Sequence, residues 1–285
     1  EYSDFIKWIE TQDKETAMKY WAEQLEGYES NCEIKPLSKP LPSELQTKTL
    51  RKGIGVTTTY KIQALSERNG CTLNTLVENV VGIVLTEYSG SKDVVFGKVV
   101  SGRNADIAGV EDIVGLFVNT IPVRINISDE MCISDLLQIQ QKKDVESTNY
   151  EYYYLSEIQN LTAQGSKLIN VLYVFENYNS GIAIKDKDSF FKLESEREQT
   201  SYNITIFVFK ENDELEFELM YDPNVYCDDE AELIMNRLLK ICDEVAEKPE
   251  ARISELETVT EREKEIILND FNATETEYPR DKTVV

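Results

Sequence analysis

Polar side chains capable of specific hydrogen bonds and ion pairs interrupt one apolar stretch of the sequence, VGLFVNTIPVR at residues 114–124. The aliphatic and aromatic residues of this stretch are typical of a buried strand. Asn119 and Thr120 lie in its middle. Pro122 then removes a backbone donor, and Arg124 ends the stretch. Because buried polar groups need partners and proline belongs at a sheet edge or a bulge, Asn119 and Thr120 either satisfy backbone groups at a bulge or serve a function.

The sequence lacks the residues that zinc binding and cysteine catalysis need. The chain contains no histidine, and its cysteines are scattered without a CxxC pair, so a zinc site has almost no ligands to draw on. A catalytic cysteine needs a basic neighbour to form its thiolate, and the local sequence supplies none. We interpret the cysteines as reduced structural thiols of a cytoplasmic protein. They are Cys32, Cys71, Cys132, Cys227 and Cys242.

The composition limits the partners. The 285 residues are 41% hydrophobic, enough for one large or two modest domains, and the net charge is −23. This charge disfavours nucleic acid and anionic membranes. No run approaches the ~20 apolar residues of a membrane helix. The N-terminus lacks an initiator Met and a signal-peptide layout, which favours a piece of a longer protein.

Hydrophobic periodicity predicts an α/β domain in which helices pack on a sheet. Thr75 and Glu78 form a plausible capping box in the third predicted helix, and Asn212-Asp213 forms the turn of a hairpin. Residues 36–48 are a proline-containing connector. The predicted helices cover residues 1–29, 59–68, 72–89, 133–145, 228–247 and 261–269. The predicted strands cover residues 93–103, 114–124, 168–178, 203–210 and 214–222.

Six motifs follow one another in an order typical of one family. The first, YSDF…W, contains Tyr2, Asp4, Phe5 and Trp8 and is similar to YxDFAVW. VGLFVNTIPVR resembles the (I/V)GxFVNT motif with its trailing Arg. VVSGR resembles the segment that precedes this motif in the family. YEYYYLSEI, VFENY and SYNITIFV match further family patterns, and VTEREKEIILNDFNATETEYPRDKTVV is similar to a linker that leads into an adenylation domain. In these motifs the chain resembles the condensation domains of nonribosomal peptide synthetases.

The resemblance also has departures. The family's HHxxxDG motif lies upstream of YxDF, and its second His is implicated in deprotonating or orienting the attacking amine. This sequence starts after that point. Tyr150 and Glu151 stand where the family often has His-Gln, and Tyr154 stands where it has Pro.

The resemblance implies the fold of chloramphenicol acetyltransferase, with two similar lobes and a tunnel between them. We expect this chain to be the C-terminal lobe, residues 1–250, with a mixed and mainly antiparallel sheet packed by helices. Residues 251–285 would be a linker and the start of an adenylation domain. The reaction that the resemblance implies is amide formation between carrier-bound donor acyl or peptidyl and acceptor aminoacyl thioesters. The chain alone would be inactive because the HHxxxDG half is absent.

The resemblance places several residues in or near the tunnel. Asn119 and Thr120 would bond the amides of a phosphopantetheine arm or the tunnel backbone, and Arg103 or Arg124 would pair with the Asp of HHxxxDG. A purely structural role is the alternative for all four. Tyr2, Asp4, Phe5 and Trp8 are interpreted as a helix-packing cluster. The candidates for the tunnel lining are Ser101, Gly102, Arg103, Gly115, Phe117, Asn119, Thr120 and Arg124.

The same resemblance predicts the partners. No cofactor or metal is expected to bind the chain directly, since the phosphopantetheine arrives on peptidyl carrier domains. The other expected partners are the missing N-terminal lobe and the downstream adenylation domain, and the isolated chain is expected to self-associate. A non-catalytic lobe that docks carrier or adenylation domains stays open as an alternative. FVNT followed by this linker argues against an epimerisation domain.

Overall fold

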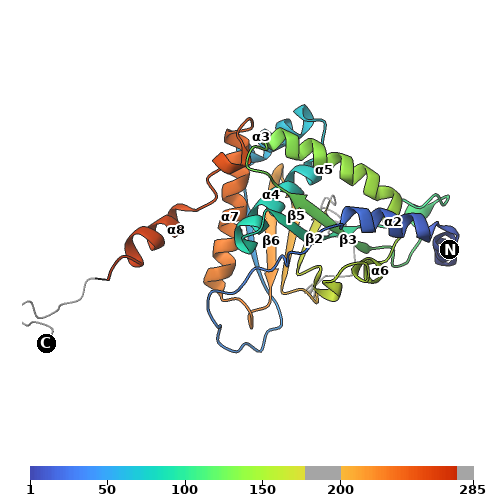
Figure 1. The fold of residues 1–285 in the computed structure, drawn as a ribbon, viewed down its shortest axis with the longest axis horizontal. Coiled ribbons are helices and arrows are strands. Elements are labelled where there is room, and N and C mark those ends of the chain that lie inside the picture. The colour runs from blue at the N-terminus through green and yellow to red at the C-terminus, as the bar shows by residue number, and fades with distance from the viewer. Residues whose placement is uncertain (177–199, 275–285) are drawn as a thin grey trace, which may run out of the picture.

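The fold is built on one mixed sheet. A computed structural model describes residues 1–176 and 200–274, and in this part of the chain six strands take the order β1-β6-β5-β4-β2-β3. The β2–β4 and β4–β5 pairs are parallel and the other pairs are antiparallel (Figure 1). The strands are β1 (Lys48–Gly53), β2 (Asp93–Val100), β3 (Asn119–Asn126), β4 (Val171–Glu176), β5 (Ile204–Glu211) and β6 (Glu214–Tyr221).

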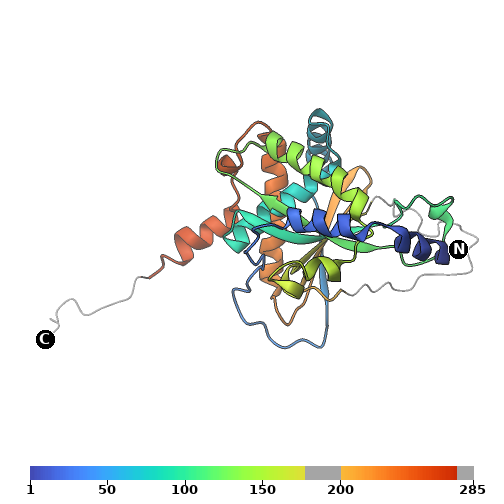
Figure 2. The same cartoon turned by 45° about the vertical axis from the view of Figure 1, so that its right-hand side comes forward.

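Helices cover both faces of this sheet. One face carries the larger core, in which Phe96 and Tyr173 of the sheet meet apolar residues of α3, α4, α5 and α7. The other face carries a second core, in which Val95 and Ile121 meet α2 and α6 (Figure 2). The helices are α1 (Tyr2–Thr11), α2 (Lys14–Gln24), α3 (Val56–Arg68), α4 (Leu73–Ser89), α5 (Ile133–Ser147), α6 (Leu155–Gln159), α7 (Asp228–Glu247) and α8 (Glu261–Glu265). None of the helices in the described ranges is both long and apolar enough to cross a membrane.

The strongest local signals are confirmed. Helix α7 has the predicted bounds, and its apolar stripe is buried. The β5–β6 hairpin turns at Asn212 and Asp213, whose φ angles of 49° and 66° suit the left-handed turn that such pairs favour. The connector at residues 36–46 has no regular structure, and all five cysteines are free. The last two residues of the strand predicted at 168–178 lie outside the described residues.

The predicted strand at residues 114–124 is partly wrong. Strand β3 begins at Asn119, and the side chains before it are exposed, with Val114 at 93% and Leu116 at 76%. Only Phe117 of this apolar run is buried. Pro122 lies on β3, which is an edge strand of the described sheet, where a missing donor is tolerated.

Two details at the start of the chain and of α4 also differ from the prediction. The helix expected over residues 1–29 is divided, because the Asp13 side chain accepts bonds from the Glu15 and Thr16 amides and starts a new helix. Helix α4 is capped by Thr72 rather than by a Thr75–Glu78 box. Strand β1 was not predicted.

Glu78 instead belongs to a buried ion cluster. The Lys98 ammonium on β2 lies 2.5 Å from the Glu78 carboxylate on α4 and 2.9 Å from that of Asp144 on α5. Gln140 donates to Glu78, and Thr75 donates to Asp144. Burial lowers the pKa of Lys98, but the two carboxylates outweigh it and raise that pKa above its ordinary value. The cluster therefore joins α4 and α5 to β2, the strand next to the edge strand β3 in the described sheet.

We expect Lys98→Met to destabilise the fold by about 3–5 kcal/mol, because it leaves two buried carboxylates without their cation. The measurement is the free energy of unfolding in urea. Lys61→Met is the matched control, since its pair with Glu247 is exposed on both sides and is worth under about 1 kcal/mol. Equal effects of the two substitutions would contradict this role for the cluster.

Candidate functional site

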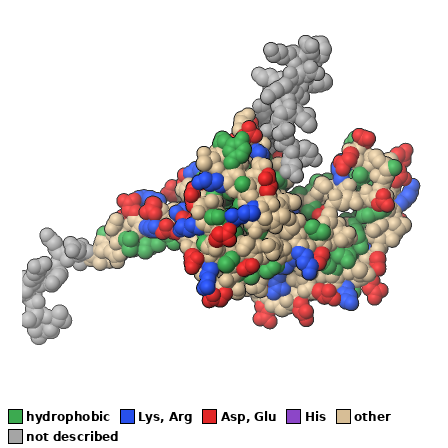
Figure 3. Space-filling view, turned by 90° about the horizontal axis from the view of Figure 1, so that it is seen from above, with side chains coloured by type: hydrophobic (Ala, Val, Ile, Leu, Met, Phe, Trp, Pro, Cys, Tyr) green, Lys and Arg blue, Asp and Glu red, His purple; other side chains and the backbone are tan. Residues whose placement is uncertain are grey.

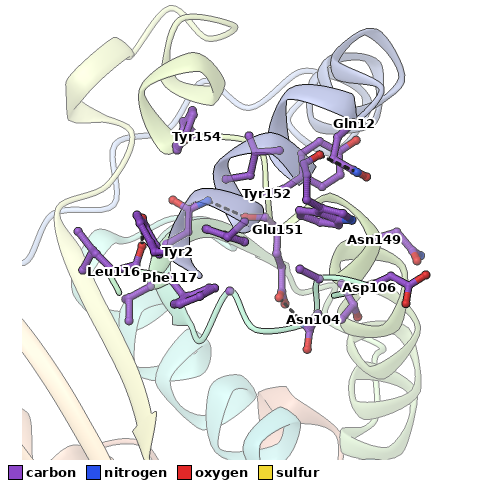
Figure 4. A pocket seen from close by; sticks show the side chains of 18 residues that line it. Tyr2, Gln12, Asn104, Asp106, Leu116, Phe117, Asn149, Glu151, Tyr152 and Tyr154 are labelled. Atoms are coloured by element: carbon purple, nitrogen blue, oxygen red, sulfur yellow. Dashed lines mark hydrogen bonds between the residues drawn. The ribbon is translucent and has the colours of Figure 1, made fainter. Parts of the chain in front are cut away.

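A hollow of about 520 Å³ opens beside the start of β3. Its walls come from α1, from the loop that joins β2 to β3, and from residues 148–154, which follow α5 (Figure 4). These segments are far apart in sequence. Helix α1 and residues 148–154 each contact the loop that joins β2 to β3 or the start of β3. This volume is in the range of small-molecule sites.

Helix α1 forms an aromatic wall of the hollow. Tyr2, Phe5 and Trp8 follow one another at a spacing of three, so they share one side of the helix. The Phe5 and Phe117 ring centroids are 4.3 Å apart, and the Tyr2 hydroxyl donates to the Leu116 carbonyl at 2.6 Å. Asp4 does not join this packing: its carboxylate is exposed and bonds the N-terminal ammonium and Lys7.

The loop before β3 depends on close backbone approaches. Gly102 has φ of +66°, and a Cβ there would lie 1.9 Å from the Phe117 carbonyl oxygen. A Cβ at Gly115 would lie 2.0 Å from the Tyr2 ring. Gly102 therefore requires glycine, whereas a side chain at Gly115 would have to displace the Tyr2 ring.

Arg103 organises the same loop. Its guanidinium lies 4.3 Å from the Phe117 ring centroid, and its Nη1 donates to the Val110 carbonyl at 2.6 Å and to the Ile113 carbonyl at 3.1 Å. The loop is thus folded around one cation.

Asn119 connects β3 to the segment after α5. Its Nδ2 donates to the Glu151 carbonyl at 2.7 Å and to the Tyr153 carbonyl at 2.9 Å. Its side chain therefore satisfies backbone groups of another segment rather than groups at a bulge. Thr120, the next residue, is half-buried and packs its methyl group near Gly97.

Arg124 lies away from the hollow, near the other end of β3. Its Nε and Nη2 bond the two Asp93 carboxylate oxygens at 2.8 and 2.7 Å. Its Nη1 donates to the carbonyls of Gln24 and Glu26. Arg124 is therefore engaged with groups of this chain and fixes the end of α2.

Three of the eight lining candidates border the hollow: Gly102, Phe117 and Asn119. Ser101, Arg103, Gly115, Thr120 and Arg124 do not line it. Asn104 and Asp106 were not predicted from the sequence, and Glu151 was noted there only as a departure from the family pattern. A signal for Glu151 was present in the aromatic residues on both sides of an isolated acid, but nothing in the sequence showed which segment it would meet.

Glu151 has the most perturbed environment in the hollow. Burial raises the pKa of its carboxyl to about 7, and the opposing hydrogen bond from Asn104 Nδ2, at 2.6 Å, does not cancel this effect. Within the described ranges no group of three or more His, Cys, Asp or Glu is arranged to hold a metal ion.

We expect Asn119→Asp to destabilise the protein by about 1–3 kcal/mol, because a carboxylate cannot donate to the two carbonyls that the amide now satisfies. Urea unfolding measures this change. Asn149→Asp is the control, since its amide donates to one exposed carbonyl at 3.2 Å and should change stability by less than about 0.5 kcal/mol. An unchanged midpoint for Asn119→Asp would show that this link does not stabilise the fold.

Comparison with known proteins identifies the family. A family model for the condensation domain matches residues 1–268. The chain is 35% identical over 291 residues to bacitracin synthase 3 of Bacillus licheniformis and 36% identical over 290 residues to tyrocidine synthase 3 of Brevibacillus parabrevis. Each alignment covers 99% of this chain but only 4% of the relative, so the chain spans a small part of these synthetases.

Solved structures agree on the fold. The chain matches a four-domain nonribosomal peptide synthetase, holo-AB3403 bound to AMP and glycine, with a TM-score of 0.75 at 18% identity, over 89% of this chain and 21% of that one. It matches the first condensation domain of the calcium-dependent antibiotic synthetase, in complex with a substrate analogue, with a TM-score of 0.65 at 16% identity, over 86% and 54%. The predicted α/β fold of the chloramphenicol acetyltransferase type is confirmed. The chain belongs to the condensation domain family of nonribosomal peptide synthetases.

Proposed function

We propose that residues 1–250 are the C-terminal lobe of a condensation domain whose complete form joins a donor acyl or peptidyl thioester to an acceptor aminoacyl thioester. The observation that carries this proposal is an exposed sheet edge and an exposed apolar loop beside the hollow. Strand β3 is an edge strand of the sheet formed by residues 1–176 and 200–274, and the loop before it exposes Val114, Leu116 and Val118. Exposed sheet edges and apolar loops usually meet a partner, and an N-terminal lobe is the partner that this family membership favours.

In the proposed reaction the acceptor amine attacks the donor thioester carbonyl. A C–N bond forms, the C–S bond breaks, the amine loses a proton and the donor arm leaves as a thiol. Much of the rate would come from holding two tethered substrates together. This chain contains no histidine, so the group that handles the proton would come from HHxxxDG in the other lobe. Arg124 is engaged with Asp93, which favours Arg103 as the partner of the HHxxxDG aspartate.

The proposed partners are peptidyl carrier domains, which bring the phosphopantetheine arms, and a following adenylation domain. The region after residue 250 supports the second partner. Ile253 and Leu256 are buried against the lobe, and Arg237 bonds Glu263 at 2.7 Å. Beyond this point α8 and the turn Ile266–Asp270 project from the body and expose an apolar side, with Leu268 at 65% and Phe271 at 70% (Figure 3). We propose residues 251–285 as the linker, and a cytoplasmic location for the assembly.

We expect the isolated chain to form no amide from loaded carriers, and a fusion with the upstream lobe to form it. The readout is the condensed product, detected by mass spectrometry after release from the carrier. Replacing the second His of HHxxxDG by Ala in the fusion should lower the rate by about 10²–10⁴-fold. A fusion that folds but makes no amide would contradict the proposal. Carrier binding by such an inactive fusion would favour the alternative, a non-catalytic docking lobe.

We expect the isolated chain to self-associate through the loop that exposes Leu116. Sedimentation velocity at increasing concentration measures this association. Leu116→Glu should raise the dissociation constant by about tenfold or more, because a buried carboxylate without a partner is costly. Leu41→Glu, at an 87% exposed site on the connector, is the control and should change nothing. A strictly monomeric chain would rule this association out.

A further inference from the structure

The hollow beside β3 combines two features that favour positively charged ligands. Its aromatic wall from α1 faces Tyr152 and Tyr154 of the segment after α5. Aromatic faces attract cations, most strongly where water is displaced. The Trp8 and Tyr152 rings already meet edge to face, with centroids 5.9 Å apart, so this part of the wall is preformed.

The ionisable side chains of the hollow have one sign. Glu151 and Asp106 line it, and no Lys or Arg occurs among the described residues of its lining. Glu151 points toward Asn104, which donates a hydrogen bond to its carboxylate (Figure 4). Asn104 uses one acceptor position of this carboxylate, and a carboxylate offers about four. The carboxylate can therefore accept a second donor from a ligand in the hollow.

Amide side chains complete the set of polar groups. Gln12, which follows α1, and Asn149, in the segment after α5, both line the hollow (Figure 4). A few polar groups in a mostly apolar hollow fix the orientation of a ligand. A ligand with an apolar stem and one charged nitrogen would meet aromatic rings along its length and the Glu151 carboxylate at its end.

We propose that this hollow binds an organic ammonium on an apolar stem, with Glu151 as its counter-ion. The proposal names the ligand class of the site described above and rests on the proposed function for the source of that ammonium, which would be an aminoacyl group delivered by a carrier. Binding itself does not depend on that source.

The surrounding charges define the pH dependence. Lys98 on β2 favours the ionised form of Glu151, whereas Asp144 on α5 opposes it. Asp106 on the loop is exposed, and Asp4 on α1 is engaged with Lys7. Burial dominates and raises the pKa of Glu151 to about 7, so the carboxylate is present above this pH and is lost below it. Ammonium binding therefore strengthens as the pH rises from 6 to 8.

The test is calorimetric titration of the 285-residue chain with phenethylamine and with its neutral analogue 2-phenylethanol. We expect phenethylamine to bind more tightly, and its affinity to fall about tenfold between pH 8 and pH 6 as Glu151 takes up a proton. The affinity for 2-phenylethanol should not change over this range. Equal affinities for the two compounds, or no binding of either, would overturn the proposal.

Two substitutions separate the charge from the aromatic wall. Glu151→Gln keeps an acceptor for Asn104 and should weaken phenethylamine binding by about 10- to 100-fold, with the pH dependence removed. Tyr154→Ala should weaken the binding of both phenethylamine and 2-phenylethanol. Glu111→Gln, which removes an exposed acid from the same loop, is the matched control and should leave binding unchanged.

Unaltered binding in Glu151→Gln would exclude Glu151 as the counter-ion. The chain could bind phenethylamine while the complete domain forms no amide. That result would support the ammonium site and reject only the aminoacyl group as the source of its ligand. Amide formation by the complete domain, without ammonium binding by the chain, would support the proposed function and reject the ammonium site.

Discussion

The position of the whole site depends on the buried Lys98 ammonium and its two carboxylates. Lys98 lies two residues before Val100, which pairs with Asn119 at the start of β3. Its bond to Asp144 fixes the end of α5, from which the chain continues directly to Glu151. One cation therefore sets the distance between the edge strand and the segment that Asn119 bonds. A buried pair of this kind contributes more to a defined geometry than to net stability.

The sequence predicts an element well where the signal is local. Helix α7 and the β5–β6 hairpin carry a regular apolar period and, in the hairpin, an Asn-Asp turn. Residues 114–118 could not be predicted in the same way, because apolar residues exposed beside an edge strand have the same composition as a buried strand. Glu78 resembled a helix cap because its partner, Lys98, lies on another element. The exposure of residues 114–118 and the role of Glu78 both depend on tertiary contacts, which the local sequence does not contain.

The site was predictable in part for the same reason. The motif around Phe117 and Asn119 selected these two residues as candidates, and both line the hollow, although the whole motif was predicted as a strand. Its acid was not predicted, because the environment of Glu151 comes from Asn104, 47 positions earlier in the sequence. The matches at 16% and 18% identity show that the same fold tolerates wide sequence change. The family motif therefore directs attention to this stretch of the chain, while the ligand class proposed for the hollow depends on Glu151, which the motif does not include.

The order of strands in the sheet has a consequence for synthesis of the chain. Strand β1 pairs with β6, and its Arg51 bonds Glu216, 165 residues later. At about 5–20 residues per second, roughly 10–30 s pass between translation of these two strands. During this interval β1 has no partner in the sheet, whereas β5 and β6 pair as soon as both have emerged from the ribosome. The nascent chain therefore carries β1 without its partner strand until β6 has been translated.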